Sequence, residues 1–117
     1  MTVAEIIEKS SSALIAQGCK ALKPESVNNC RYRGPNGTKC AIGWLIPDDK
    51  YLPEMEDSTV ASILEGYDLS FLLPTDLPSD LGIKFLTELQ SIHDETWNTV
   101  ESWPSKFQKL AEKWSRC

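Results

Sequence analysis

Three side chains in this sequence have the chemistry of a metal site or a nucleophilic centre: Cys30, Cys40 and His93. Thiolates and imidazole are the usual ligands of tetrahedral zinc, and Cys19 or Asp94 could supply a fourth ligand. The separation of the two central cysteines is much longer than that of a zinc knuckle. The spacing therefore favours cysteines that are buried as small hydrophobic side chains, with a Cys30–Cys40 disulfide as an alternative in oxidised protein.

His93 and Asp94 are a second candidate for chemistry, because histidine is the side chain best suited to acid–base work near neutral pH. Adjacent side chains on a helix point about 100° apart, so Asp94 is not expected to orient His93. No nucleophile motif accompanies the histidine, and it continues a stripe of apolar residues at helical spacing. The sequence thus predicts that His93 packs in the core and that the protein is not an enzyme.

Charged side chains are unevenly distributed along the chain, whose net charge is −5. Residues 20–39 are basic, residues 48–101 are strongly acidic, and residues 102–117 are basic again. Such segregation favours a charged protein partner over nucleic acid, although a merely solvated surface would explain it too. The candidate partner-binding residues lie in the basic turn and the acidic stretch after it: Arg31, Arg33, Asn36, Lys39, Asp48, Asp49, Glu54, Glu56 and Asp57.

The elements that must position these residues begin with a helix over residues 3–17, which a Thr2-x-x-Glu5 capping box opens and Gly18 ends. A β-hairpin is expected next. Its first strand covers residues 30–33, its turn residues 34–37 and its second strand residues 38–46. The end of the second strand does not alternate between apolar and polar residues, and a short helix after Cys40 would explain it equally well.

Three further helices are expected after the hairpin. Asp57 or Ser58 caps a short one, which Gly66 ends, and a longer one opens at Ser79. The last helix follows Trp103. The apolar face of the longer helix is predicted to consist of Leu81, Phe85, Leu89 and Ile92. Together the elements predict an α+β fold, mainly helical, in which an N-terminal helix, one β-hairpin and three further helices surround a single core over residues 1–117.

Nothing in the sequence predicts export or insertion into a membrane. The longest apolar runs, residues 41–46 and 69–73, are far shorter than the roughly 20 residues that span a bilayer. The first helix also carries charged residues where a leader peptide would be apolar. A cytoplasmic protein with reduced thiols is therefore expected.

One segment resembles a group of small proteins encoded by bacteriophages and prophages, through the pattern Cys30-x-Tyr32-Arg33-Gly34-x-x-Gly37-x-Lys39-Cys40-Ala41-x-Gly43-x-Leu45-Ile46-Pro47-Asp48-x-x-Tyr51. A later stretch, Leu89-Gln90-x-Ile92-His93-Asp94, looks like a second part of the same pattern. By analogy with phage accessory proteins, the resemblance implies an inhibitor of a host or bacterial defence protein, anti-CRISPR proteins among them, that works by protein–protein contact in the host cytoplasm without a cofactor.

Two alternatives remain open at the level of sequence. The first is a small zinc- or thiol-dependent regulator or enzyme that uses Cys30, Cys40 and His93. The second is a self-associating phage assembly protein. The oligomeric state and the identity of a partner do not follow from the residues.

Overall fold

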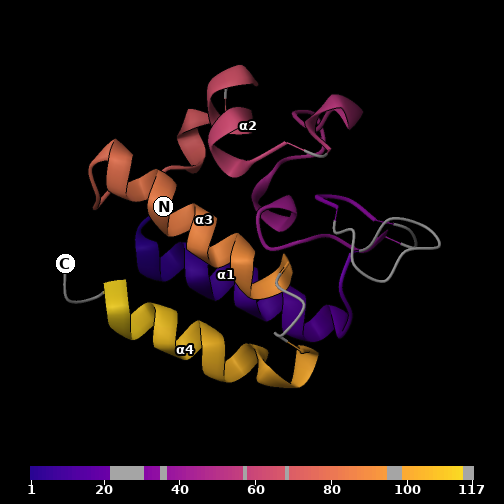
Figure 1. The fold of residues 1–117 in the computed structure, drawn as a ribbon, viewed down its shortest axis with the longest axis vertical. Helices are drawn as coiled ribbons and strands as arrows, with labels where there is room; N and C mark the ends of the chain where they lie inside the picture. Colours follow the sequence, from indigo (N-terminus) through magenta and orange to yellow (C-terminus); the bar gives the residue numbers. More distant parts are fainter. Residues whose placement is uncertain (22–30, 35–36, 57, 68, 95–98, 115–117) are drawn as a thin grey trace.

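The computed structural model of the chain, which describes residues 1–21, 31–34, 37–56, 58–67, 69–94 and 99–114, is built from helices (Figure 1). Its α-helices are α1 (Val3–Gln17), α2 (Val60–Gly66), α3 (Ser79–Asp94) and α4 (Trp103–Trp114). Short 3-10 helices join them: η2 (Gly43–Leu45), η3 (Pro53–Met55), η4 (Ser70–Leu72) and η5 (Val100–Ser102). Helix α4 packs on both α1 and α3, and α2 lies against α3.

Helix α1 has the bounds that the sequence predicts, and its capping box is confirmed. The Thr2 hydroxyl accepts a hydrogen bond from the Glu5 amide at 3.2 Å, and the Glu5 carboxylate accepts one from the Thr2 amide at 2.9 Å. At the other end Gly18 takes a left-handed conformation with φ 72°, and its amide donates to the Leu14 carbonyl. Both ends of α1 are therefore defined by local interactions.

The prediction of an α+β fold with a β-hairpin was wrong, because the described residues contain no strand. A single antiparallel bridge joins Arg33 to Lys39, and the Gly34 amide donates to the Thr38 carbonyl at 2.8 Å. Beyond Cys40 the chain turns and enters η2. The three residues 30, 35 and 36 of the expected hairpin lie outside the described part of the chain.

The chain turns after Cys40 because this segment is buried on all sides. Cys40, Ala41 and Ile42 are fully buried, whereas a strand with one covered face would expose every second side chain. Side chains of the surrounding helices satisfy its backbone: Ser10 donates to the Ala41 carbonyl at 3.0 Å, and Gln90 accepts from the Ile42 amide at 3.0 Å. A helical turn whose backbone forms hydrogen bonds with side chains of other helices thus takes the place of a β-ladder.

The later helices occur where the sequence predicts them, with two differences. The N-cap of α2 is Thr59, whose hydroxyl accepts from the Ser62 amide at 3.2 Å, in place of Asp57 or Ser58. In α3, Leu81 lies on the exposed side, so the buried face begins one residue later, at Gly82. The other three predicted positions, Phe85, Leu89 and Ile92, are buried.

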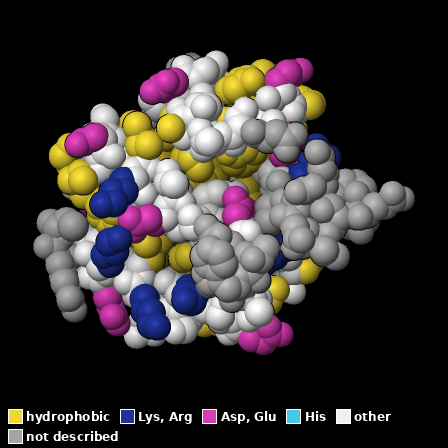
Figure 2. All heavy atoms as spheres, in the orientation of Figure 1, with side chains coloured by type: hydrophobic (Ala, Val, Ile, Leu, Met, Phe, Trp, Pro, Cys, Tyr) yellow, Lys and Arg dark blue, Asp and Glu magenta, His cyan; other side chains and the backbone are white. Residues whose placement is uncertain are grey.

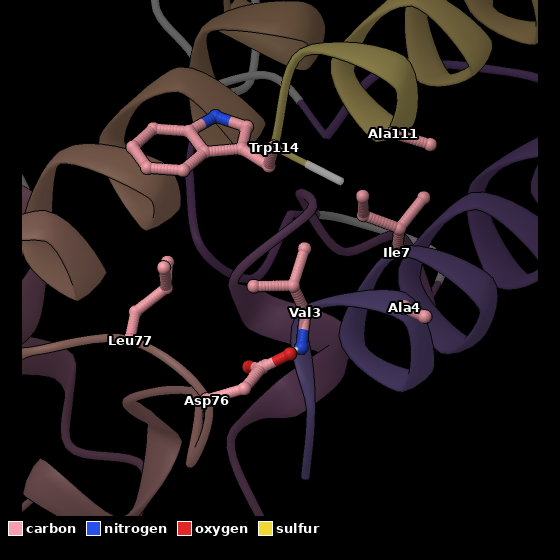
Figure 3. Close-up of a pocket in the computed structure, with 7 residues that line it drawn as sticks. All are labelled: Val3, Ala4, Ile7, Asp76, Leu77, Ala111 and Trp114. Atoms are coloured by element: carbon pink, nitrogen blue, oxygen red, sulfur yellow. Dashed lines mark hydrogen bonds between the residues drawn. The ribbon is translucent and has the colours of Figure 1, made fainter. Parts of the chain in front are cut away.

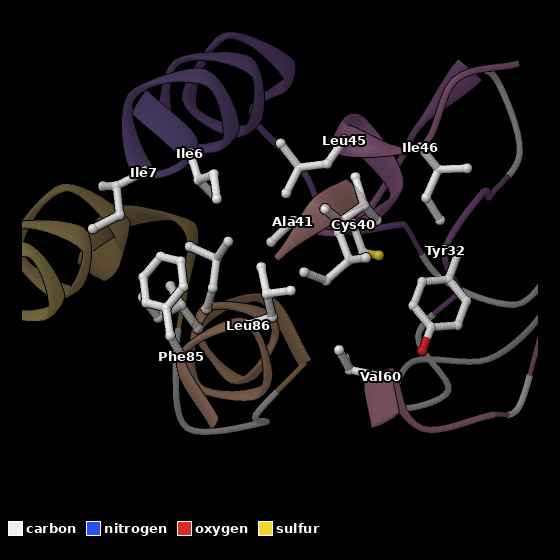
Figure 4. Close-up of a cluster of buried hydrophobic side chains, with 14 of the residues drawn as sticks. Ile6, Ile7, Tyr32, Cys40, Ala41, Leu45, Ile46, Val60, Phe85 and Leu86 are labelled. Atoms are coloured by element: carbon white, nitrogen blue, oxygen red, sulfur yellow. The ribbon is translucent and has the colours of Figure 1, made fainter. Parts of the chain in front are cut away.

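One hydrophobic core joins α1, α2, α3 and α4 to the segment around η2 (Figure 4). In Figure 4, Ile6 and Ile7 of α1 point toward Phe85 and Leu86 of α3, and Ala41 lies between these two helices. The segment around η2 thus serves as the layer between α1 and α3.

We predict that Gly43→Ala destabilises the protein strongly, because a Cβ at this position would overlap the carbonyl oxygen of Tyr32. A forced shift of a packed segment costs about 1–3 kcal/mol or more. Gly66→Ala is the matched control, since a Cβ at Gly66 meets open space and alanine favours the helix. Urea unfolding of both variants is the measurement. Equal stabilities for the two variants would contradict the close packing at Gly43.

Candidate functional site

A buried polar network centred on His93 joins the C-terminal part of α3 to the segment that follows α1. The imidazole is fully buried, and its Nε2 accepts a hydrogen bond from the Ala21 amide at 2.9 Å. Nδ1 therefore carries the proton and donates to Asp94 Oδ1 at 2.7 Å. Trp103 stacks on the ring, with centroids 6.0 Å apart. The burial of His93 is confirmed.

The expectation that Asp94 cannot orient His93 was wrong. Backbone positions 100° apart do not prevent contact near a helix end, where a short carboxylate can turn sideways toward its neighbour. Gln90, one turn earlier, donates to both oxygens of Asp94 at 3.0 Å each. The carboxylate is thus fixed by two side chains of its own helix.

The His93–Asp94 arrangement resembles a catalytic acid–base pair. Its hydrogen bonds, however, hold the backbone at Ala21 in place. The nitrogen that would take a proton from a substrate, Nε2 of His93, is occupied by the Ala21 amide inside the core. Asp94 lines a shallow hollow of about 200 Å³ together with Tyr32 and Ser91. The Tyr32 hydroxyl there donates to the Ser58 carbonyl at 2.6 Å, and burial raises the pKa of the phenol.

Three of the candidate zinc ligands, Cys40, His93 and Asp94, are engaged in other contacts. Both ring nitrogens of His93 have protein partners, and Cys40 Sγ accepts from the Gly43 amide at 3.2 Å. Burial also raises the pKa of the Cys40 thiol, whereas zinc binds the thiolate. No group of three His, Cys, Asp or Glu side chains converges within the described ranges. Cys19 is exposed, and Cys30 lies outside the described residues.

Several residues predicted to bind a partner contact one another. Arg33 pairs with Asp48 at 2.7 Å, and Lys39 lies 3.9 Å from the same carboxylate. Arg31 lies 3.7 Å from Glu56. The basic turn and the acidic stretch after it, which the sequence suggests as two contact regions, thus form one charged cluster.

Glu56 is the centre of this cluster. Its carboxylate accepts hydrogen bonds from the Tyr32 amide at 2.9 Å, the Arg33 amide at 3.2 Å and the Tyr51 hydroxyl at 2.5 Å. Only 9% of its side chain is exposed. Glu56 therefore fixes the path of the chain, in the way that Ser10 and Gln90 fix the segment around η2.

The remaining candidates divide by exposure. The side chain of Asp48 is 84% exposed, and Asp49 and Glu54 are exposed as well. Asn36 and Asp57 lie outside the described residues. A partner can therefore reach Asp48, Asp49 and Glu54 directly.

Gln17 is a positioning residue that the sequence reasoning missed. Its carbonyl oxygen accepts from the Lys39 amide at 2.8 Å and from Trp44 Nε1 at 3.2 Å, while its amide group donates to the Lys39 carbonyl at 3.0 Å. Gln17 thus ties the end of α1 to the turn. The sequence did contain a sign of this role, because Gln17 is a polar residue on the covered side of an amphipathic helix. Ser10 and Gln90 are polar residues in the same kind of position.

A second group of charges lies on α4. Lys106, Lys109 and Lys113 recur at helical spacing, and lysine side chains gather over α4 in the lower part of Figure 2. Lys113 donates to Glu88 of α3 at 2.8 Å, and Trp114 Nε1 donates to the same carboxylate at 3.1 Å. Part of this positive charge therefore serves the packing of α4 on α3.

Comparisons of the chain with profiles of known protein families, with curated protein sequences and with solved structures found no match. Among the described residues, no helix has the length and apolar character that crossing a membrane requires.

We predict that Glu56→Gln destabilises the protein by about 2–3 kcal/mol, because an amide cannot accept all the hydrogen bonds that the carboxylate accepts and also leaves Arg31 without its charge partner. Glu54→Gln, an exposed change two residues earlier on η3, is the control and should leave stability unchanged. The free energy of unfolding in urea measures both. A Glu56→Gln protein as stable as the control would show that the cluster is dispensable.

We predict a loss of stability in alkali that depends on two tyrosines. Burial raises the pKa of Tyr32, and burial together with Glu56 raises that of Tyr51. The contribution of these two tyrosines to the free energy of unfolding is complete below the ordinary tyrosine pKa of about 10. It is lost as the pH rises through the pKa values of the folded state. Burial also raises the pKa of the Cys40 thiol, so Cys40 adds to the loss of stability at high pH whichever tyrosine is replaced.

Urea unfolding at a series of pH values from about 8 to about 11 measures this effect. Tyr32→Phe should flatten the decline, whereas the control Tyr67→Phe should not. The same decline in both variants would assign the alkaline sensitivity to other groups.

Proposed function

We propose that this protein acts by binding another protein through an exposed loop over residues 47–54, and that it carries out no bond chemistry. The support on the chemical side is the His93 network, whose candidate catalytic atoms are engaged with the backbone or buried. The support on the binding side is the loop itself, which carries an apolar side chain between acidic ones.

The observation that carries the proposal is the exposure of Leu52 on a firmly held loop. Leu52 is 47% exposed, although both of its sides are anchored. Before it, Arg33 donates to the Ile46 carbonyl at 3.1 Å and lies over the Tyr51 ring at 4.6 Å. After it, Met55 is fully buried. An apolar group that is held in place before binding loses little conformational entropy when a partner covers it.

The surroundings of Leu52 suit the rim of an interface. Asp49 and Glu54 outnumber Lys50 among the exposed charges of the same loop, and Asp48 is exposed while it pairs with Arg33. An apolar centre within a polar rim is the common anatomy of protein interfaces. Charge complementarity then favours a partner with a basic surface around an apolar depression.

The resemblance of residues 30–51 to phage-encoded proteins supports a host or bacterial defence protein as the partner and the host cytoplasm as the location. The loop begins inside that segment, so its anchoring residues Arg33, Asp48 and Tyr51 belong to the resembling pattern. Inhibition would follow from occupying a surface that the partner needs for its own ligand.

We predict that the tagged protein captures a partner from bacterial lysate, and that Leu52→Ala weakens the purified complex at least about tenfold, as truncation of an interface anchor does. Ile15→Ala is the matched control, because Ile15 on α1 is also 47% exposed. Affinity is measured with the partner identified by mass spectrometry, and inhibition by plating phage on cells that express each variant.

Two results would contradict the proposed function. One is equal weakening by Leu52→Ala and Ile15→Ala, which would remove the loop from the interface. The other is a lack of any saturable partner together with unchanged phage plating and CRISPR interference on expression.

A further inference from the structure

A cavity of about 330 Å³ lies between the first turns of α1, the last turn of α4 and the segment before α3 (Figure 3). Its size falls within the range of small-molecule sites, about 300–1,000 Å³. Among the described residues, the lining is apolar except for one carboxylate: Val3, Ala4, Ile7, Asp76, Leu77, Ala111 and Trp114.

Two of the residues that line the cavity, one on each of two packed helices, have small side chains. Ala4 and Ala111 do not reach far enough to fill the space between α1 and α4. Trp114 could fill it only by turning, and its ring is held elsewhere. Its Nε1 donates to Glu88 at 3.1 Å, and its ring packs edge-on against Phe85 with centroids 5.7 Å apart.

The charge at the mouth of the cavity is negative. Asp76 is exposed, and its Oδ1 accepts from the Val3 amide at 3.0 Å, which fixes the carboxylate beside the cavity (Figure 3). Glu5 lies close enough to act electrostatically on Asp76. The amino terminus also acts on Glu5, with the sign opposite to that of Asp76. Asp76 is the charged side chain among the described residues that line the cavity.

We propose that this cavity is a binding site for a small amphipathic amine, whose alkyl or aryl chain fills the apolar interior and whose ammonium group pairs with Asp76. An anion of the same size would be repelled at the mouth, and a neutral alcohol would bind without the ionic contribution. The site is independent of the proposed protein partner, since the loop over residues 47–54 contributes nothing to its lining.

A series of n-alkylammonium ions from butyl to octyl tests the proposal, with 1-hexanol and hexanoate as probes of charge. Each methylene that enters the cavity should tighten binding about fourfold until the space is full. Amide and indole resonances in a ¹⁵N spectrum should shift first at Val3 and Trp114. Hexylammonium should bind about tenfold more tightly than hexanol, and hexanoate should be weakest.

Two pairs of variants locate the site. Ala4→Leu should fill the cavity and weaken hexylammonium binding at least about tenfold, whereas Ala16→Leu, another exposed alanine of α1, should not. Asp76→Asn keeps an acceptor for the Val3 amide and should abolish the preference for hexylammonium over hexanol. Asp80→Asn, an exposed acid of α3, should preserve it.

Three outcomes would overturn the proposal. They are equal affinity for hexylammonium and hexanol, resonance shifts centred away from Val3 and Trp114, and binding that Ala4→Leu and Ala16→Leu change to the same extent. The resonance shifts require only the unaltered protein, so they decide the matter even if Ala4→Leu does not fold. A failure here would leave the Leu52 loop as a candidate interface, since the two sites use different residues.

Discussion

The structure depends on satisfying the backbone of a buried segment that has no neighbouring strand. Residues 40–46 occupy the space between α1 and α3, where an unpaired amide or carbonyl group costs free energy. Side chains from both helices supply the partners: Ser10 bonds to Ala41, and Gln90 bonds to Ile42. Hence these two residues are polar on mainly apolar helix faces. The positions of the helices and of the segment between them are set together.

The same principle explains why residues that look chemically active have structural contacts. His93 accepts the Ala21 amide, Gln17 pairs with both backbone groups of Lys39, and Glu56 accepts two consecutive amides at Tyr32 and Arg33. Each of these side chains replaces a backbone partner that a sheet would have provided. A protein of this size with little regular pairing outside its helices must use its buried polar groups in this way.

Helices and their ends could be predicted from the sequence, because local rules determine them. The capping box at Thr2 and Glu5 and the glycine at position 18 act within a few residues of each other. The secondary structure of residues 38–46 could not be predicted, since an apolar run is compatible with a buried strand and with a buried helical turn alike. Which of the two forms depends on Ser10 and Gln90, which are distant in sequence. The contacts within the candidate site could not be predicted for a related reason: opposite charges that looked like two surfaces, at Arg33 and Asp48, pair with each other.

Outside these internal contacts, two places in the described part of the chain combine accessible apolar surface with acidic side chains. The loop around Leu52 keeps an exposed apolar side chain because Arg33 and Met55 fix its two sides without covering it. The cavity beside Asp76 remains open because Trp114 is committed to Glu88. In both places the fold holds apolar surface next to fixed acidic groups. In both proposals apolar area contributes affinity while the carboxylates select for positive charge, so the two proposed sites rest on the same physical means of discrimination.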